Sequence, residues 1–190
     1  MKLAMNVSAW WIMGSAAVLM LSATTARAED FSGPYAGVEA GHTITDVDGV
    51  TIAGPFELKE KGAVISAVAG YRLPVGADSR VVVGVEGSVG SYTKRAEARY
   101  GVSGTVGFRI VDQGLLYGRV GYAWLDGVDA NFGDGLHGVV YGGGYEHKLT
   151  DAISLRAEYR RIDWKGGVGV PDNASYFEGQ EIAAALLYNF

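Results

Sequence analysis

Apolar and polar residues alternate with a period of two along most of the chain after residue 34. In the segment Arg80–Tyr92, for example, Val81, Val83 and Val85 share one face, and Glu86 lies on the other. Successive side chains of a strand point to opposite faces, so this period predicts strands rather than helices. About eight strands are expected, at Tyr35–Thr43, Gly62–Leu73, Arg80–Tyr92, Arg99–Val111, Leu115–Leu125, Gly138–Lys148, Ile153–Trp164 and Glu181–Phe190.

The connections between these segments alternate in length. The tight connections are Leu73–Ser79, Asp112–Gly114 and Leu149–Ala152, with Tyr92–Ala98 as a further short one. The long connections, rich in Gly, Asp and Asn, are Ile44–Lys61, Asp126–His137 and Lys165–Gly179. Short turns on one side and longer loops on the other are typical of an outer-membrane barrel, with its turns in the periplasm.

Each expected strand has an apolar face and a face of Gly, Ser, Thr, Glu and Arg, which fits two kinds of barrel. A soluble barrel of lipocalin type would turn its apolar faces inward. A membrane barrel would turn them to lipid and enclose its charges. Enclosed charges must be paired, and here four acids and four arginines share the polar face, which favours an enclosed network. Its expected members are Glu39, Glu86, Arg109, Arg119, Glu146, Arg156, Glu158 and Arg160.

Aromatic residues on the apolar faces gather toward the two ends of the expected strands. Two aromatic belts around an aliphatic band are typical of the two membrane interfaces. The residues expected to form these belts are Tyr71, Phe108 and Tyr145 near the periplasm, and Tyr100, Tyr122 and Trp124 near the outside. We therefore predict an all-β fold: a closed, antiparallel transmembrane β-barrel of about eight strands.

The first thirty residues differ from the rest of the chain. Lys2 precedes an apolar run, Ala9–Leu21, and Ala26–Ala28 has the small-x-small pattern of a cleavage site. The run has the length of a signal-peptide core and is short for a spanning helix, although an uncleaved anchor is the alternative. We expect residues 1–28 to be a cleavable signal peptide for export and residues 29–190 to be the barrel domain.

Charge and candidate chemistry narrow the function further. The formal net charge is −5 and no basic run occurs, which argues against nucleic acid as a partner. The absence of Cys leaves no disulfide and no thiolate metal site. His42, His137 and His147 are too scattered to share one metal, so no metal and no cofactor are expected. Haem capture by a histidine at the outer rim remains an alternative.

Several stretches resemble a known family: PYAGVEAG, GVEGSVG, LLYGRVGYAW, YGGGYEHKLTD, LRAEYRRIDW and the terminal LLYNF. Together they resemble the porin-family outer-membrane β-barrel proteins, the small opacity-type surface antigens of Gram-negative bacteria. The resemblance runs from about Gly33 to Phe190, and Arg161-Ile162 departs from it where the family often has an aromatic residue. It implies that Leu186, Tyr188 and Phe190 form the signal read by the barrel-assembly machinery.

These observations predict an integral outer-membrane protein with a role in envelope integrity and surface interaction, and no enzymatic activity. The expected partners are outer-membrane lipid, lipopolysaccharide and, during biogenesis, the barrel-assembly machinery. The alternatives are a narrow porin-like diffusion channel, haem or adhesin binding through the outer loops, and a soluble lipocalin-like barrel. The sequence names no external ligand and no oligomeric state.

Overall fold

The computed structural model describes residues 31–51, 54–93, 98–126, 136–165 and 177–190. The expected signal peptide and its boundary with the barrel lie outside these residues. So do most of the expected long connections Asp126–His137 and Lys165–Gly179. No helix in the described part of the chain is long and apolar enough to cross a membrane.

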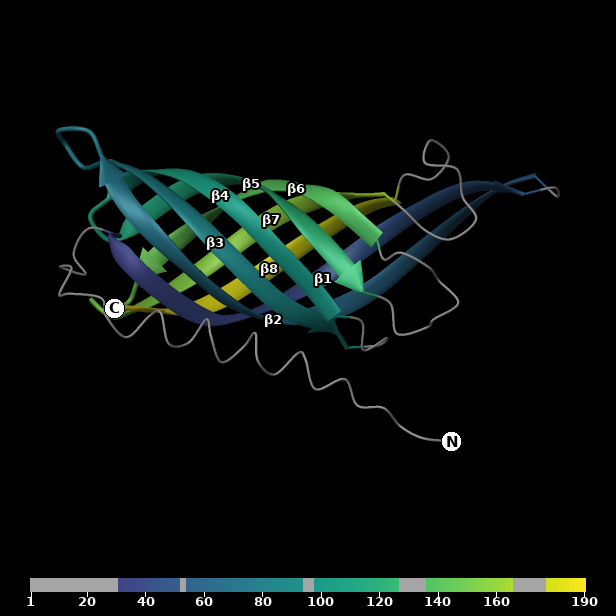
Figure 1. Cartoon of the computed structure of the whole chain (residues 1–190), viewed down its shortest axis with the longest axis horizontal. Helices are drawn as coiled ribbons and strands as arrows, with labels where there is room; N and C mark the ends of the chain where they lie inside the picture. The colour runs from purple at the N-terminus through teal and green to yellow at the C-terminus, as the bar shows by residue number, and fades with distance from the viewer. Residues whose placement is uncertain (1–30, 52–53, 94–97, 127–135, 166–176) are drawn as a thin grey trace.

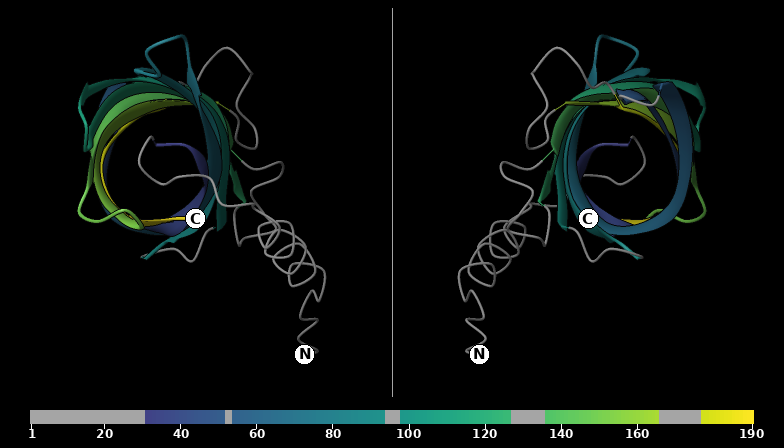
Figure 2. Two further views of the ribbon diagram at one scale, coloured as in Figure 1. Left: turned by 90° about the vertical axis from the view of Figure 1, so that its left-hand side faces the viewer. Right: turned by 90° about the vertical axis from the view of Figure 1, so that its right-hand side faces the viewer.

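Eight antiparallel strands form a closed barrel, as predicted from the alternation (Figure 1). Each strand pairs with the next, and β8 returns to pair with β1, so the sheet has no open edge around the barrel (Figure 2). Closure matters in lipid, where an unpaired backbone group has no water to bond. The strands are β1 Gly33–Thr51, β2 Gly54–Val75, β3 Val81–Tyr92, β4 Ala98–Val111, β5 Gly114–Asp126, β6 Leu136–Lys148, β7 Ile153–Lys165 and β8 Phe177–Asn189.

The prediction of a loop at Ile44–Lys61 is wrong. The first two strands continue through it as a paired ribbon, from Ile44 opposite Lys61 to Thr51 opposite Gly54. This ribbon projects past the other strands (Figure 1). Its Asp and Gly residues gave it the composition of a loop, but it is also rich in β-branched Ile, Thr and Val, which favour extended backbone. The last strand also begins earlier than expected, at Phe177 and not at Glu181.

The two faces of the sheet have the polarity of a membrane barrel. On the outside, Val85, Val106 and Val120 are more than 60% exposed, whereas the inward-facing Glu146 and Glu158 are at most 4% exposed. A soluble barrel has the opposite arrangement, because its apolar face forms the core. The lipocalin-like alternative is therefore wrong.

The two ends of the barrel differ. At one end, which we call the foot, lie the three short turns and both ends of the described barrel. There the Phe190 amide donates to the Pro34 carbonyl at 3.1 Å, and the Asn189 amide donates to the Ala152 carbonyl at 2.8 Å. The opposite end, which we call the rim, carries the β1–β2 ribbon. In an outer-membrane barrel the end with short turns faces the periplasm.

Candidate functional site

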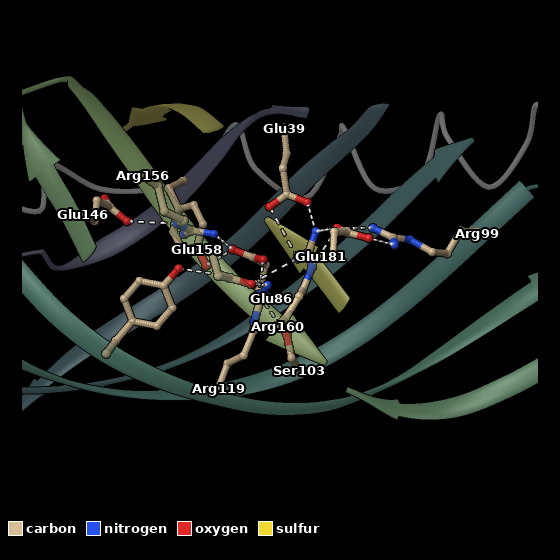
Figure 3. A network of polar contacts seen from close by, with 12 residues as sticks. Glu39, Glu86, Arg99, Ser103, Arg119, Glu146, Arg156, Glu158, Arg160 and Glu181 are labelled. Carbon is tan, nitrogen blue, oxygen red and sulfur yellow. Dashed lines mark hydrogen bonds and ion pairs between the residues drawn. The ribbon is translucent and has the colours of Figure 1, made fainter. Parts of the chain in front are cut away.

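A chain of ion pairs runs along the lumen, and Figure 3 shows most of the side chains that form it. We call this set of side chains the lumen network, and all of them are buried. It contains five arginines and five glutamates, and every strand contributes at least one of them. Its members are Arg72, Glu146, Arg156, Glu86, Arg119, Glu158, Arg160, Glu39, Glu181 and Arg99.

The foot half of the network is built around Glu146 of β6. Arg72 of β2 donates two hydrogen bonds to its carboxylate, each 2.9 Å long. Ser154 adds a third bond at 2.7 Å, and Arg156 Nε donates a fourth at 3.3 Å. Arg156 also reaches Glu86 of β3 at 2.6 Å, so it joins this half to the centre. The two parallel bonds from Arg72 form a bidentate, charge-assisted pair, which is stronger than a hydrogen bond between neutral groups.

In the centre, Arg119 of β5 bridges two carboxylates. One nitrogen donates to Glu158 at 2.6 Å, and the other contacts Glu86 and, at 3.1 Å, Ser103. The hydroxyl of Tyr117 also donates to Glu158. Each central carboxylate therefore accepts hydrogen bonds from more than one strand, which ties opposite walls of the barrel together.

In the rim half, Arg160 of β7 contacts Glu39 of β1, Glu158 of its own strand and Glu181 of β8. Its Nε donates to Glu181 at 2.9 Å. Arg99 of β4 donates to the same carboxylate at 2.6 and 3.3 Å and is the last member of the network. The network thus alternates in charge from Arg72 at the foot to Arg99 at the rim.

Strand β7 contributes more residues to the lumen network than any other strand. Arg156, Glu158 and Arg160 are spaced two residues apart, so all three point to the same face of the strand. Each of the other seven strands supplies one member. Placing ten charges in a lumen is costly unless they are paired, and an uncompensated buried ion costs several kcal/mol. Because charges alternate along the network, every ion has a partner of opposite sign, which offsets much of that cost.

Two tyrosines on the lumen face each lie over a glycine that is directly opposite on the neighbouring strand, Tyr35 over Gly70 and Tyr117 over Gly144. The hydroxyl of Tyr35 donates to Glu86 at 2.7 Å, and a Cβ on Gly70 would collide with that hydroxyl. In the same way, a Cβ on Gly144 would lie 2.7 Å from the hydroxyl of Tyr117. Glycine in a strand often marks such close approaches. Here these residues give the tyrosines room to reach the carboxylates.

Seven of the eight residues expected in the enclosed network lie in it. Arg109 lies instead toward the foot, next to the turn after β4, where its guanidinium is 3.9 Å from Asp112. The β4–β5 register shifts between Arg109 and Val111, at the end of the ladder. Three members were missed: Arg72, Arg99 and Glu181 lie near the ends of the expected strands. All three lie within the predicted strands and have the lumen parity, so the alternation alone would have found them.

The aromatic residues lie where the alternation placed them. Tyr71, Phe108 and Tyr188 face outward near the foot, and Tyr100 and Trp124 face outward near the rim, all between 41% and 52% exposed. The other two predicted belt residues, Tyr145 and Tyr122, also face outward near the foot and the rim, respectively. The residues expected to form the assembly signal are Leu186, Tyr188 and Phe190. The first two lie on the outer face of β8, and Phe190 follows directly after this strand and is also exposed.

The histidines do not form a common site. His42 is exposed on the outer face of β1, His137 stacks on Tyr122 with ring centroids 5.9 Å apart, and His147 lies near the foot beside Tyr145. Within the described ranges, no three His, Cys, Asp or Glu residues lie close enough together to hold a metal ion.

Phe31 fills the foot of the lumen. Its ring is 2% exposed and packs with Val82, Leu115 and Tyr117. The ammonium nitrogen of Lys148 lies 4.8 Å from the ring centroid, a cation–π distance. Positive φ angles at Phe31 (48°) and Gly33 (92°) turn the chain here, just before β1. The sequence pattern gave no sign of this contact, because Phe31 precedes the first alternating segment.

The hydroxyl of Tyr117 gives a first test of the network. Tyr117→Phe is expected to lower the free energy of unfolding by about 1.5–3 kcal/mol, because Glu158 loses a hydrogen bond to a charged group. Tyr159→Phe is the control, since its hydroxyl donates to Gln180 at 3.2 Å on the exposed outer face. Urea unfolding in lipid vesicles measures both variants. Equal losses for the two would contradict a special role of the buried bond.

A closed sheet with an apolar exterior, a charged lumen and its termini at the short-turn end defines a transmembrane β-barrel. The sequence comparison gives the same class: the outer membrane protein beta-barrel domain family model matches residues 13–190. The chain therefore belongs to this family and is a protein of the outer membrane, as the sequence predicted.

Solved structures of the same fold include Neisserial surface protein A (NspA). It is 19% identical, with a TM-score of 0.54, and the match covers 84% of this chain and 98% of that one. OprG from Pseudomonas aeruginosa is 10% identical with a TM-score of 0.48, covering 87% and 99%. Ail of Yersinia pestis is 14% identical with a TM-score of 0.40, covering 82% and 99%. No curated protein matches the chain significantly in sequence.

Proposed function

We propose that this protein is a non-conducting structural barrel that supports the integrity of the outer membrane and makes surface contacts outside the cell. The observation that carries the proposal is the lumen network, in which ten paired charges from all eight strands occupy the interior. A barrel of this size is just wide enough for side chains to fill. Phe31 adds a plug at the foot.

The network also supports a structural rather than an enzymatic role. Its carboxylates are each bound by at least one guanidinium, so their charge is used in holding the walls together. The β1–β2 ribbon extends past the rim, on the side that faces outward in such barrels, and is a natural place for surface contacts. Lipid and lipopolysaccharide would contact the exposed apolar face and its aromatic ends.

Conductance separates the proposal from its main rival, a narrow diffusion channel. In planar bilayers the protein is expected to give no discrete current steps, because the ion pairs and Phe31 occupy the path. Phe31→Ala is expected to be silent as well, since the network above it stays intact. Discrete steps from the unmodified barrel would overturn the non-conducting role and favour the channel.

The role in the envelope needs a test in cells. A strain without the gene is expected to become more sensitive to detergent, and the unmodified chain should restore resistance. Heat-modifiable gel migration of the membrane fraction shows whether the restored protein is folded and in place. A deletion strain with unchanged sensitivity would contradict the envelope role.

A further inference from the structure

The segment just before β1 docks into the lumen at the foot, and four other strands hold its aromatic ring. The ring of Phe31 is buried, and the side chains around it come from β2, β3, β5 and β6. Two of them are cations: the guanidinium of Arg72 lies 5.9 Å from the ring centroid, and the ammonium of Lys148 lies 4.8 Å from it. We call the surrounding set the foot pocket; its members are Arg72, Val82, Leu115, Tyr117 and Lys148.

The ladder of the barrel does not include Phe31. Backbone pairing of β1 with β2 begins at Gly33, opposite Arg72, and pairing of β1 with β8 begins at Tyr35. The ring is therefore held by burial and by its contacts with the two cations. Because Phe31 precedes the first backbone pair, its ring can leave the foot pocket while every strand of the barrel stays paired.

The docked segment has a strained backbone. Phe31 has a φ of 48°, in the left-handed region that a bulky side chain rarely adopts. Gly33 has a φ of 92°, which glycine adopts readily and other residues do not. Burial of the ring favours the docked state, whereas relief of this strain favours release. The free-energy difference between the two states is therefore smaller than burial of the ring alone would give.

We propose that Phe31 is a reversible latch at the periplasmic end of the lumen. The ring leaves the foot pocket and returns to it while the eight strands remain paired, which is a local opening and not an unfolding of the barrel. When the latch is open, water and small periplasmic solutes reach the foot half of the lumen network, where Arg72 pairs with Glu146. The ion pairs of the centre still separate this space from the rim half.

Thiol labelling tests the latch, because the chain contains no Cys. Val82→Cys places a thiol in the foot pocket, and Ser88→Cys is the matched control on the same face of β3, in the rim half. In folded barrels, methyl methanethiosulfonate is expected to label Val82→Cys faster than the barrel unfolds. Adding Phe31→Ala should raise this labelling rate by at least about tenfold, because a buried ring is lost. Adding Gly33→Ala should raise it about fivefold, because the docked φ disfavours a side chain.

Neither added change should alter the labelling rate of Ser88→Cys. Labelling of Val82→Cys no faster than global unfolding would overturn the latch. Equal acceleration at Val82→Cys and Ser88→Cys would also overturn it, because the barrel would then be loosened as a whole. Ser154→Cys, buried beside Glu146 in the foot half, is a second reporter with the same expected results if Val82→Cys does not fold. Heat-modifiable gel migration shows that each variant is folded, and none of these rates depends on whether the barrel supports the envelope.

Discussion

Replacing Arg160 with methionine is expected to lower the free energy of unfolding by about 3–5 kcal/mol, the cost of removing one partner from a buried ion pair. Arg160 is the one residue of the network that contacts three carboxylates, those of Glu39, Glu158 and Glu181. Methionine keeps much of the length of the side chain but leaves these charges short of a partner. Urea unfolding in lipid vesicles, followed by tryptophan fluorescence, measures the loss.

Arg161→Met is the matched control for this experiment. Arg161 is the next residue of the same strand, faces outward and pairs with Glu178, with side chains 37% and 55% exposed. An exposed pair is worth about 0–1 kcal/mol, so this variant should unfold nearly as the unmodified protein does. Similar losses for Arg160→Met and Arg161→Met would show that burial in the lumen does not decide the energetics.

A charge placed on the outer face is expected to have the second largest effect. Val120 lies in the middle of β5 and is 61% exposed on the apolar exterior. Val120→Arg should lower the free energy of unfolding by about 2–4 kcal/mol in lipid, the cost of arginine near the bilayer midplane. The same vesicle assay measures this loss. The destabilisation comes from placing the charge in the hydrocarbon around the barrel, and no contact inside the lumen is changed.

Val111→Arg tests the dependence on depth. Val111 ends β4 at the foot, beside a short turn, and is 55% exposed. Near the membrane interface the same charge costs about 0–1 kcal/mol. A larger loss at Val111 than at Val120 would contradict the position of the membrane around this barrel. Equal, small losses at both would mean that the outer face meets water.

The alternation of apolar and polar residues was enough to predict the barrel, because the same two-residue period assigns each side chain of a strand to the outer face or to the lumen. Once Val85 is assigned to lipid, Glu86 must face the lumen, and the same rule places Arg156, Glu158 and Arg160. The orientation of the sheet followed from the pairing of charges, which an enclosed space demands and a wet surface does not. The faces of the strands and the orientation of the sheet could thus be predicted from the types of residue along each strand, and the structure agrees with both.

The parts that failed depend on contacts between distant residues. Which arginine meets which glutamate is set by barrel closure, so Arg99 and Glu181, 82 residues apart, could not be paired from the sequence. The ribbon was missed because the residues from Ile44 to Lys61 have the composition of a loop, although their backbones pair. The buried position of Phe31 follows from the shape of the completed lumen.

The distribution of partners around β7 has a consequence for how the barrel assembles. Its two arginines and one glutamate find their counterparts on β1, β3, β5, β6 and β8, and Glu39 lies 121 residues away from Arg160 in sequence. A partly inserted sheet would carry unmatched ions into hydrocarbon before the last seam closes. We therefore expect closure of the barrel and its insertion to be coupled. The hairpins would stay at the membrane surface until β1 pairs with β8, and the closed barrel would then enter the bilayer.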